Sequence, residues 1–405
     1  MFQSTRLPHC AVAAMFLIAA SASLAAPQDP FEPNDTCGTS TAVNLGTTIN
    51  LTVGPDDDYY RADVQDNSEI IAIALDGSGD PLSIEILEAG CGTVIASATN
   101  APIRYFDCGG LARDIVVRVP GAMLTDEPYS LLVTSNEVVD DNLEDNDSCG
   151  LGSSIAISTF TTPDLVVTAC DEDFFVARLE NAGVELQVDA LFTQFRGDID
   201  LELWDAGCNT LLASSLSSTA NESIRYVNTT SPSMPEDVVV RVFMKNGVGN
   251  NTYALTACFA DTDDPSVGVQ SCAGEINSTG RPGTLCGRGS DVANDNRLLL
   301  YVVDLPNASA GYFITSPTAG FTATPAGSVG NLCLATPGRY SFDPQFTGNA
   351  NAVFYQPNLL MTPIAGGGFS PVTAGQRQFW QYWYRDSVGG VAVSKFSSAL
   401  CVEFQ

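Results

Sequence analysis

Apolar and polar residues alternate over short runs along most of this chain. Ile84, Ile86 and Val94 are the apolar positions of one such run, and Ser83 and Glu85 are polar positions. A period of two places successive side chains on opposite faces of a strand, so we expect the three apolar residues to face a core. No segment keeps a helical apolar period over about 11 residues. The pattern therefore predicts an all-β fold.

Two stretches of the chain carry the same landmarks in the same order, which indicates an internal repeat. Each copy opens with an acidic turn and a Cys, continues with an acidic triplet before two aromatic residues, and closes with an apolar strand. These landmarks are Glu32–Ser40, Asp56–Tyr60 and DIVVRV from Asp114 in the first copy, and Glu144–Ser154, Asp171–Phe175 and DVVVRV from Asp237 in the second. Short alternating runs broken by Gly, Asn, Asp and Pro are typical of sandwiches. We predict two tandem jelly-roll-like β-sandwiches, at 26–136 and 137–260.

The first 25 residues have the features of a secretion signal. Met1–His9 carries one basic side chain, and Ala11–Ala25 is apolar and ends in the small-x-small motif Ser23-Leu24-Ala25. These features predict a signal peptide at 1–25 that is cleaved after Ala25. An N-terminal core helix is the competing interpretation. No later apolar stretch reaches the ~18 residues that span a bilayer, so we expect a secreted or cell-surface protein without a membrane span.

Export would place the cysteines in an oxidising compartment, where disulfides are the usual state. The chain has 12 cysteines, of which Cys10 falls in the predicted signal peptide, so an odd number remains. None has CxxC spacing, which disfavours a zinc site. Cys37 is our candidate for the leftover thiol or for an unusual pairing, because Pro55 stands where the second copy has Cys170. The pairs that we expect are Cys91–Cys108, Cys149–Cys170, Cys208–Cys258, Cys272–Cys286 and Cys333–Cys401.

Charge and composition exclude several function classes. The chain has 47 Asp and Glu against 17 Lys and Arg, a formal net charge of −30. Such an acidic surface repels phosphate backbones, so nucleic acid is not an expected partner. His9 is the single histidine and lies in the predicted signal peptide. The mature chain therefore has no imidazole for a Ser-His-Asp triad, a Cys-His pair or a His-ligated zinc.

The repeated landmarks resemble the bacterial pre-peptidase C-terminal domain, a β-sandwich that accompanies secreted peptidases and occurs in tandem on other exported proteins. The resemblance covers about Asp29 to Ala260, although no peptidase domain is evident in this chain. In the second copy Asp145 replaces the Pro of the family motif. The residues that carry the resemblance are Glu32-Pro33-Asn34-Asp35 with Asp56, Asp58 and Tyr60, and then Glu144, Asn146, Asp147, Asp171, Asp173 and Phe175.

The resemblance also implies calcium, because the matching segments hold calcium together in relatives that bind collagen. Calcium takes six to eight oxygen ligands, which carboxylates and Asn amides supply. Solvated acidic turns are the competing interpretation, since Asn and Asp are favoured in turns. The resemblance implies a first site of Glu32, Asn34, Asp35, Asp56 and Asp58, and a second site of Glu144, Asn146, Asp147, Asp171 and Asp173.

A third β-rich region follows a polar stretch that reads as a linker at 261–270. Strand-like runs at Arg297–Asp304, Gln376–Arg385 and Ser398–Phe404 predict a β-rich C-terminal module at 271–405. Its Trp-rich strand and final apolar strand resemble a C-terminal module of secreted planctomycete-type proteins, which implies no activity. Trp380, Tyr382 and Tyr384 share one face of a strand. We favour a core position for them over an exposed platform that stacks on sugar or peptide.

These observations favour a non-catalytic protein whose calcium-assisted sandwiches bind an extracellular polysaccharide or protein. A secreted enzyme that cleaves glycans with paired carboxylates is one alternative. Asp198 and Asp200 are the candidate pair for it, because they lie two residues apart and would point to one face of a strand. A structural envelope protein without a ligand is the other alternative.

Overall fold

The computed structural model describes residues 30–405 except 66, 109–112, 122–126, 151, 155–159, 230–234, 246–248 and 348–350. The predicted signal peptide and its cleavage position after Ala25 lie outside the described residues. Within them the chain consists of β-strands, loops and single-turn 3₁₀ helices, so the all-β prediction is confirmed. The helical turns are η1 (Cys37–Thr39), η2 (Gln194–Arg196), η4 (Ala293–Asp295), η5 (Pro325–Gly327) and η6 (Leu359–Met361). The chain divides into two compact units, and the second contains Thr134–Gln405.

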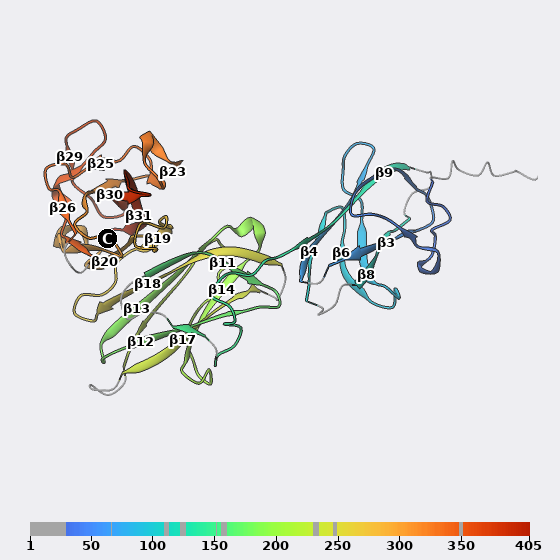
Figure 1. Ribbon diagram of the computed structural model, residues 1–405, viewed down its shortest axis with the longest axis horizontal. Coiled ribbons are helices and arrows are strands. Elements are labelled where there is room, and N and C mark those ends of the chain that lie inside the picture. The colour runs from blue at the N-terminus through green and yellow to red at the C-terminus, as the bar shows by residue number, and fades with distance from the viewer. Residues whose placement is uncertain are drawn as a thin grey trace, which may run out of the picture. The chain divides into compact units, whose positions relative to one another are not determined.

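The first copy of the repeat forms a sandwich of two sheets (Figure 1). The five-stranded sheet has the order β1 (Thr41–Ala42), β3 (Asp58–Val64), β8 (Arg113–Val119), β5 (Ile84–Glu88) and β6 (Val94–Ala98). The four-stranded sheet has the order β2 (Gly46–Val53), β9 (Glu127–Glu137), β4 (Ser68–Asp76) and β7 (Ile103–Asp107). Alternate residues of β3 and β4 are buried, as the period of two predicts for strands with one face on a core.

The second copy repeats this arrangement strand for strand. Its five-stranded sheet has the order β10 (Ser153–Ser154), β12 (Asp173–Leu179), β17 (Glu236–Met244), β14 (Ile199–Asp205) and β15 (Leu211–Ser215). Its four-stranded sheet has the order β11 (Phe160–Thr168), β18 (Asn250–Asp261), β13 (Val184–Phe192) and β16 (Glu222–Val227). Side chains from both sheets, such as Leu186 of β13 and Leu201 of β14, form one buried cluster between them. The repeat in the sequence is therefore a repeat of the fold.

One core prediction in the first copy is wrong. Ile84 and Ile86 are fully buried, but 49% of Val94 is exposed. Val94 begins the edge strand β6, and the pairing of β5 with β6 shifts register after Ile86, where Leu87 comes opposite Val94. The alternation predicted within β5 therefore does not continue through the turn into β6.

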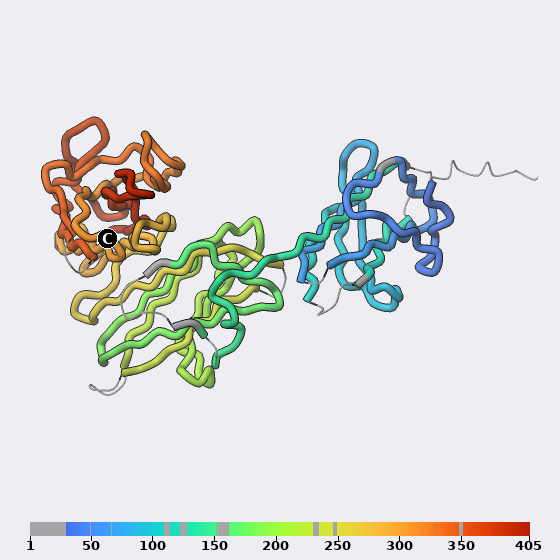
Figure 2. Tube along the Cα trace, in the orientation of Figure 1, coloured from blue at the N-terminus to red at the C-terminus, as the bar shows by residue number. Residues whose placement is uncertain are grey.

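The C-terminal region is a third β-rich structure with a different strand order. Its largest sheet has the order β19 (Val269–Cys272), β31 (Val391–Glu403), β30 (Arg377–Val388), β22 (Ala310–Ser316) and β25 (Gly338–Arg339), with β26 (Gln345–Phe346) also beside β22. A smaller sheet has β20 (Thr284–Gly289), β21 (Leu298–Val303) and β27 (Val353–Tyr355). Two hairpins, β23 (Ala319–Ala323) with β24 (Asn331–Leu334) and β28 (Thr362–Pro363) with β29 (Phe369–Ser370), complete it. The path of the chain can be followed in Figure 2.

The aromatic residues of β30 divide between its two faces. Trp380, Tyr382 and Tyr384 are fully buried in the main C-terminal core, so the prediction of a core position is confirmed. Trp383 points to the other face and is half-buried beside a smaller cluster that includes Phe396.

The stretch predicted as a linker is bonded to the second sandwich. The backbone N–H of Ser266 donates to Oε1 of Glu185 at 3.3 Å, and Nε2 of Gln187 donates to the carbonyl of Gly268 at 3.0 Å. The disulfide Cys258–Cys286 joins β18 of the second sandwich to β20 of the C-terminal region. These contacts hold the two parts together within the second compact unit.

None of the five expected disulfide pairs is formed. The pairs are Cys37–Cys91, Cys108–Cys170, Cys149–Cys208, Cys258–Cys286 and Cys272–Cys333. Among the cysteines that the structure describes, the one without a disulfide is Cys401 and not Cys37. Cys37–Cys91 and Cys149–Cys208 are equivalent bonds in the two copies, since each joins the opening acidic turn to the loop after β5 or β14. The expected pairs Cys91–Cys108 and Cys149–Cys170 favoured cysteines close in sequence, whereas the observed partners of Cys91 and Cys149 lie 54 and 59 residues away.

Five disulfides fit an extracellular, oxidising compartment, where such bonds persist. In the part of the chain that the structure describes, no helix has the length and apolar character needed to cross a membrane.

Candidate metal centres

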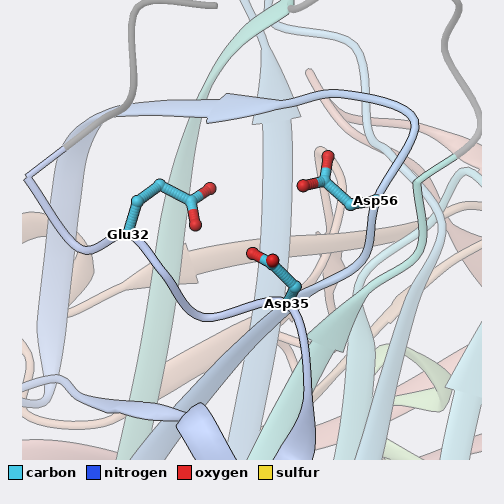
Figure 3. Close-up of side chains that lie close together, drawn as sticks. All are labelled: Glu32, Asp35 and Asp56. Carbon is cyan, nitrogen blue, oxygen red and sulfur yellow. The ribbon is translucent and has the colours of Figure 1, made fainter. Parts of the chain in front are cut away.

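Three carboxylates meet at one corner of the first sandwich. Glu32 and Asp35 come from the turn before η1, and Asp56 comes from the loop between β2 and β3. One oxygen of each lies within 4.8 Å of an oxygen of the others. Figure 3 shows the three side chains converging from two loops on the same space. This arrangement offers oxygen atoms alone, which suits a hard cation.

Asn34 and Asp58 lie beneath this corner and not in the group of three carboxylates. Asn34 is fully buried, and neither its amide nitrogen nor its amide oxygen has a hydrogen-bond partner in the described structure. Asp58 is 1% exposed and accepts a hydrogen bond from the Tyr129 hydroxyl at 2.7 Å. A buried amide without partners is costly, so Asn34 is the part of this corner that most needs a ligand.

Two local features hold the first corner in place. The backbone N–H of Asn34 donates to Oε2 of Glu32 at 3.0 Å, and the N–H of Tyr59 donates to the carbonyl of Asn34 at 2.9 Å. Gly121 packs so closely against the backbone of Asp56 that a Cβ there would clash with it. Any other residue at Gly121 would therefore displace the loop that carries Asp56.

The second sandwich gathers more carboxylates at the equivalent corner. Asp140, Glu144 and Asp171 form one group whose oxygens lie within 4.8 Å of one another, and Asp141, Glu144 and Asp173 form another. Glu144 belongs to both groups, so five acids converge here. Asp173 is fully buried and accepts a hydrogen bond from the Tyr253 hydroxyl at 2.5 Å, as Asp58 does from Tyr129.

Burial raises the pKa values of three carboxyl groups at this second corner. Loss of solvent is the largest cause in each case, and it raises the pKa of Glu144 to about 7, of Asp171 to about 8 and of Asp173 to about 9. Neighbouring acids add to the effect: Asp147 forms a hydrogen bond with Glu144, and Asp140 forms one with Asp171. These groups resist ionisation together unless a cation compensates their charge.

The Asn146 amide also contacts Glu144. Its nitrogen donates to Oε1 at 3.0 Å and to Oε2 at 2.9 Å. Asn146 is itself 1% exposed, so this buried amide lies against the central carboxylate of the second corner.

The structure brings together six of the ten residues expected to bind metal. They are Glu32, Asp35, Asp56, Glu144, Asp171 and Asp173. The buried residues Asn34, Asp58 and Asn146 lie within two residues of these groups in the sequence, and Asp147 contacts Glu144. Whether each residue is a ligand remains a prediction.

Sequence reasoning missed Asp140 and Asp141, because they precede the repeated motif, whose second copy was taken to begin at Glu144. A signal was present: Asp29 stands three residues before Glu32, as Asp141 stands three before Glu144. Asp29 itself lies outside the described residues.

The pair Asp198 and Asp200 belongs to a different cluster in the second sandwich. Their oxygens lie within 4.8 Å of each other and of Glu222. Lys245 is in place among them, with its Nζ 2.9 Å from Oδ2 of Asp198 and 3.7 Å from Oδ1 of Asp200. Burial raises the pKa of Asp200 to about 6, and the Lys245 ammonium opposes that rise. An ammonium thus already supplies the positive charge that this cluster needs.

Comparisons with known proteins give no family. No family model matches the chain, and no curated protein matches it. One similar solved structure is described as the triple jelly-roll fold and turret assembly of an archaeal virus, at 9% identity over 88% of this chain and 85% of that one, with a TM-score of 0.19. Another is dimeric latent PorU from Porphyromonas gingivalis, at 11% identity over 81% of this chain and 33% of that one, with a TM-score of 0.17. Likenesses this low have no bearing on function.

Proposed function

We propose that this chain is a non-catalytic secreted or cell-surface protein whose two sandwiches are stabilised by calcium and bind an extracellular polysaccharide or protein. The observation that carries the proposal is the recurrence of an oxygen-only corner at the same place in both sandwiches. An acidic cluster that arose by chance on one surface would have no reason to recur on equivalent loops. The resemblance to pre-peptidase C-terminal domains supports calcium as the cation.

The donor set fits calcium on chemical grounds. Carboxylates and an Asn amide are the ligands that calcium prefers, and it tolerates the irregular geometry of loop sites. In the first corner Glu32, Asp35 and Asp56 would hold the ion, and Asn34 is the adjacent amide without a partner. In the second, Glu144 would be the central ligand because it belongs to both groups of carboxylates. The ion would join the opening turn of each sandwich to the loop before β3 or β12.

The predicted signal peptide and the disulfides support an extracellular role. A signal peptide cleaved near Ala25 would deliver the chain to the compartment in which its disulfides persist. Calcium is abundant outside cells, so even a weak site of the extracellular class, with a dissociation constant of about 0.1 to 1 mM, would be filled there.

A binding role is favoured over glycan cleavage by the surroundings of Asp198 and Asp200. Retaining glycosidases hold their two carboxyl groups about 5 Å apart with the sugar between them. Here Lys245 forms ion pairs with both carboxylates, so it competes with a sugar for the same oxygens. The rival enzyme therefore requires Lys245 to leave the pair before substrate enters.

The metal part of the proposal is tested by calorimetric titration with calcium, after a chelator has removed bound metal from the full chain. We expect two classes of site, with the second corner tighter by about tenfold or more because affinity rises with the number of charged ligands. Glu144→Gln should remove the tight class and Glu32→Gln the weak one, each leaving the other class in place. Magnesium at the same concentration serves as the control ion. No heat of binding and no calcium-dependent rise in Tm would contradict the proposal.

Incubation of the purified chain with polysaccharides and collagenous proteins tests the binding part. Retention on one of these polymers without new reducing ends or peptides is the expected result. Release of new reducing ends, lost in Asp200→Asn, would instead establish the glycan-cleaving enzyme. Retention on none of the polymers would leave the structural envelope protein as the better account.

A further inference from the structure

We propose that the C-terminal domain binds a carboxylated saccharide, such as a uronic acid residue of an acidic polysaccharide, in a pocket on the outer face of its largest sheet. The pocket has a volume of about 510 Å³, within the range of small-molecule sites. Trp383 and Arg385 of β30, Phe396 of β31 and Arg339 of β25 line its floor. Leu332 of β24 and the turn of η5 line the opposite side.

The charge of this pocket is opposite to that of the molecule. The chain as a whole carries a formal net charge of −30, but the described residues that line the pocket include two arginines and no Asp or Glu. Within the described chain, neither Arg339 nor Arg385 forms an ion pair, whereas Arg118, Arg241 and Arg377 each pair with a carboxylate. The lining therefore offers two guanidinium groups that no carboxylate of the described chain neutralises.

Both arginines are held in position by aromatic rings. The guanidinium of Arg385 lies over the Trp383 ring at 5.2 Å, and its Nη1 donates to Oγ of Ser394 at 2.8 Å. The guanidinium of Arg339 lies over the Tyr312 ring at 5.1 Å. Tyr312 and Trp383 are paired across β22 and β30 with their ring centroids 6.0 Å apart. Guanidinium groups ordered in advance lose little entropy when they bind a carboxylate.

Backbone hydrogen bonds also fix the opposite side of the pocket. The N–H of Val329 donates to the carbonyl of Ser394 at 2.8 Å, which joins the end of the η5 turn to β31. Within that turn, the N–H of Ser328 donates to the carbonyl of Pro325 at 2.9 Å. The pocket therefore has its shape before a ligand arrives, as is usual for small-molecule sites.

The lining favours an acidic sugar over an acidic peptide. A uronic acid offers a carboxylate that an arginine can bind in two-pronged fashion, hydroxyls that both donate and accept, and a C–H face that packs on apolar walls. Trp383, Phe396 and Leu332 provide such walls, and Ser328 and Ser394 provide hydroxyls. A peptide would bring a row of backbone amide N–H groups, and among the described lining side chains only the hydroxyls of Ser328 and Ser394 can accept them.

The proposed pocket specifies a ligand class for the binding role proposed above, and the proposal rests on that role. Binding in the pocket needs no calcium. The test is calorimetric titration of the full chain with tetragalacturonate and with its fully methyl-esterified form, which keeps the rings and loses the charge. We expect the ester to bind at least about tenfold more weakly, because it lacks the charged hydrogen bonds to arginine. We also expect Arg339→Gln and Arg385→Gln each to weaken tetragalacturonate binding about tenfold or more.

Arg377→Gln is the matched control, because Arg377 is an exposed arginine on the same strand that pairs with Glu403 at 3.0 Å. It should leave the affinity unchanged, and so should a chelator. No binding of tetragalacturonate, equal affinity for acid and ester, or full affinity in both pocket variants would overturn the proposal. Tighter binding of polyglutamate would reassign the pocket to acidic polypeptides. Loss of binding on chelation would place the ligand at the calcium corners, which separates this proposal from the preceding one.

Discussion

The two sandwiches have the same strand order, and they differ in how much negative charge meets at the equivalent corner. In the first, Glu32, Asp35 and Asp56 converge, and both aspartates are exposed. In the second, five acids converge, and Asp173 is fully buried. The additional acids Asp140 and Asp141 come from the segment that enters the second sandwich. The shared strand order thus gives both sandwiches the same corner. The segment that precedes the second sandwich adds the extra negative charge there.

In each sandwich an equivalent tyrosine donates a hydrogen bond to the last carboxylate of the acidic triplet. Tyr129 donates to Asp58 in the first sandwich, and Tyr253 donates to Asp173 in the second. The first copy adds one hydroxyl, because Tyr60 lies 2.6 Å from the Tyr129 hydroxyl where the second copy has Phe175. The second corner therefore combines more charge with fewer hydrogen bonds beneath it. This difference makes the second corner the more dependent on a cation.

The largest expected effect is a pH dependence that belongs to the second sandwich. Without calcium, the folded state keeps protons on Glu144, Asp171 and Asp173 with pKa values of about 7, 8 and 9, whereas unfolded carboxylates release theirs near pH 4. Stability is thus complete below about pH 4 and is lost as pH rises through these folded values. We expect a loss on the order of a few kcal/mol between pH 5 and 9, after allowance for solvent screening.

Thermal unfolding at pH 5, 7 and 9, in chelator and in excess calcium, measures this loss. Calcium should reverse it, because the cation binds the deprotonated groups and its affinity rises with pH. Glu144→Gln should flatten part of the slope in chelator, and Glu32→Gln in the first corner should leave the slope in place. A melting temperature that stays level or rises with pH in chelator would contradict the assignment of these protons.

The second effect concerns the tyrosines. Tyr129→Phe and Tyr253→Phe each remove the donor from a buried carboxylate, so each should cost about 1–3 kcal/mol in the free energy of unfolding. Tyr60→Phe gives the first sandwich the arrangement of the second and leaves the bond from Tyr129 to Asp58 intact. It should cost about 1 kcal/mol or less. Urea unfolding of the three variants compares them, and a Tyr60→Phe cost equal to that of Tyr129→Phe would show that the extra hydroxyl is essential.

Much of this comparison could be predicted from the sequence, because local patterns determine it. Alternation placed Ile84 and Ile86 in the core, and the order of the landmarks predicted a repeated fold. The turn at Glu32 and the triplet at Asp56 were expected to meet, and they do. Such features depend on residue spacing within a strand or a turn, or on the similarity of the two copies. Spacing and similarity are both visible in the sequence.

The features that were missed depend on contacts between distant segments. Cys37 bonds to Cys91 across 54 residues, and no local pattern distinguishes that partner from Cys108. Val94 is exposed because of a register shift in a hairpin, which the alternation of its neighbours does not reveal. Arg339 and Trp383 meet in one pocket only through Tyr312 of a strand between them. Pairings of this kind are properties of the tertiary fold.

The smallest expected effect concerns an arginine that both sandwiches place between two acids. Arg118 binds Asp57 and Glu85, and Arg241 binds Glu172 and Glu202. Arg241 contacts both oxygens of Glu172, at 2.6 and 2.7 Å, whereas Arg118 directs two nitrogens at a single oxygen of Asp57. These groups are partly exposed, so each arginine to methionine change should cost about 1 kcal/mol or less.

Arg241→Met should be the more costly of the two, because Arg241 also lies 4.2 Å from the centroid of the Phe243 ring, and Arg118 lies 5.9 Å from that of Tyr59. Urea unfolding at low salt measures the difference, and about 1 M NaCl should reduce it, since salt screens exposed pairs. A larger cost for Arg118→Met, or a difference unaffected by salt, would mean that packing and not charge separates the two copies here. The difference in charge between the two copies would then have to be sought at the corner acids and not at these arginines.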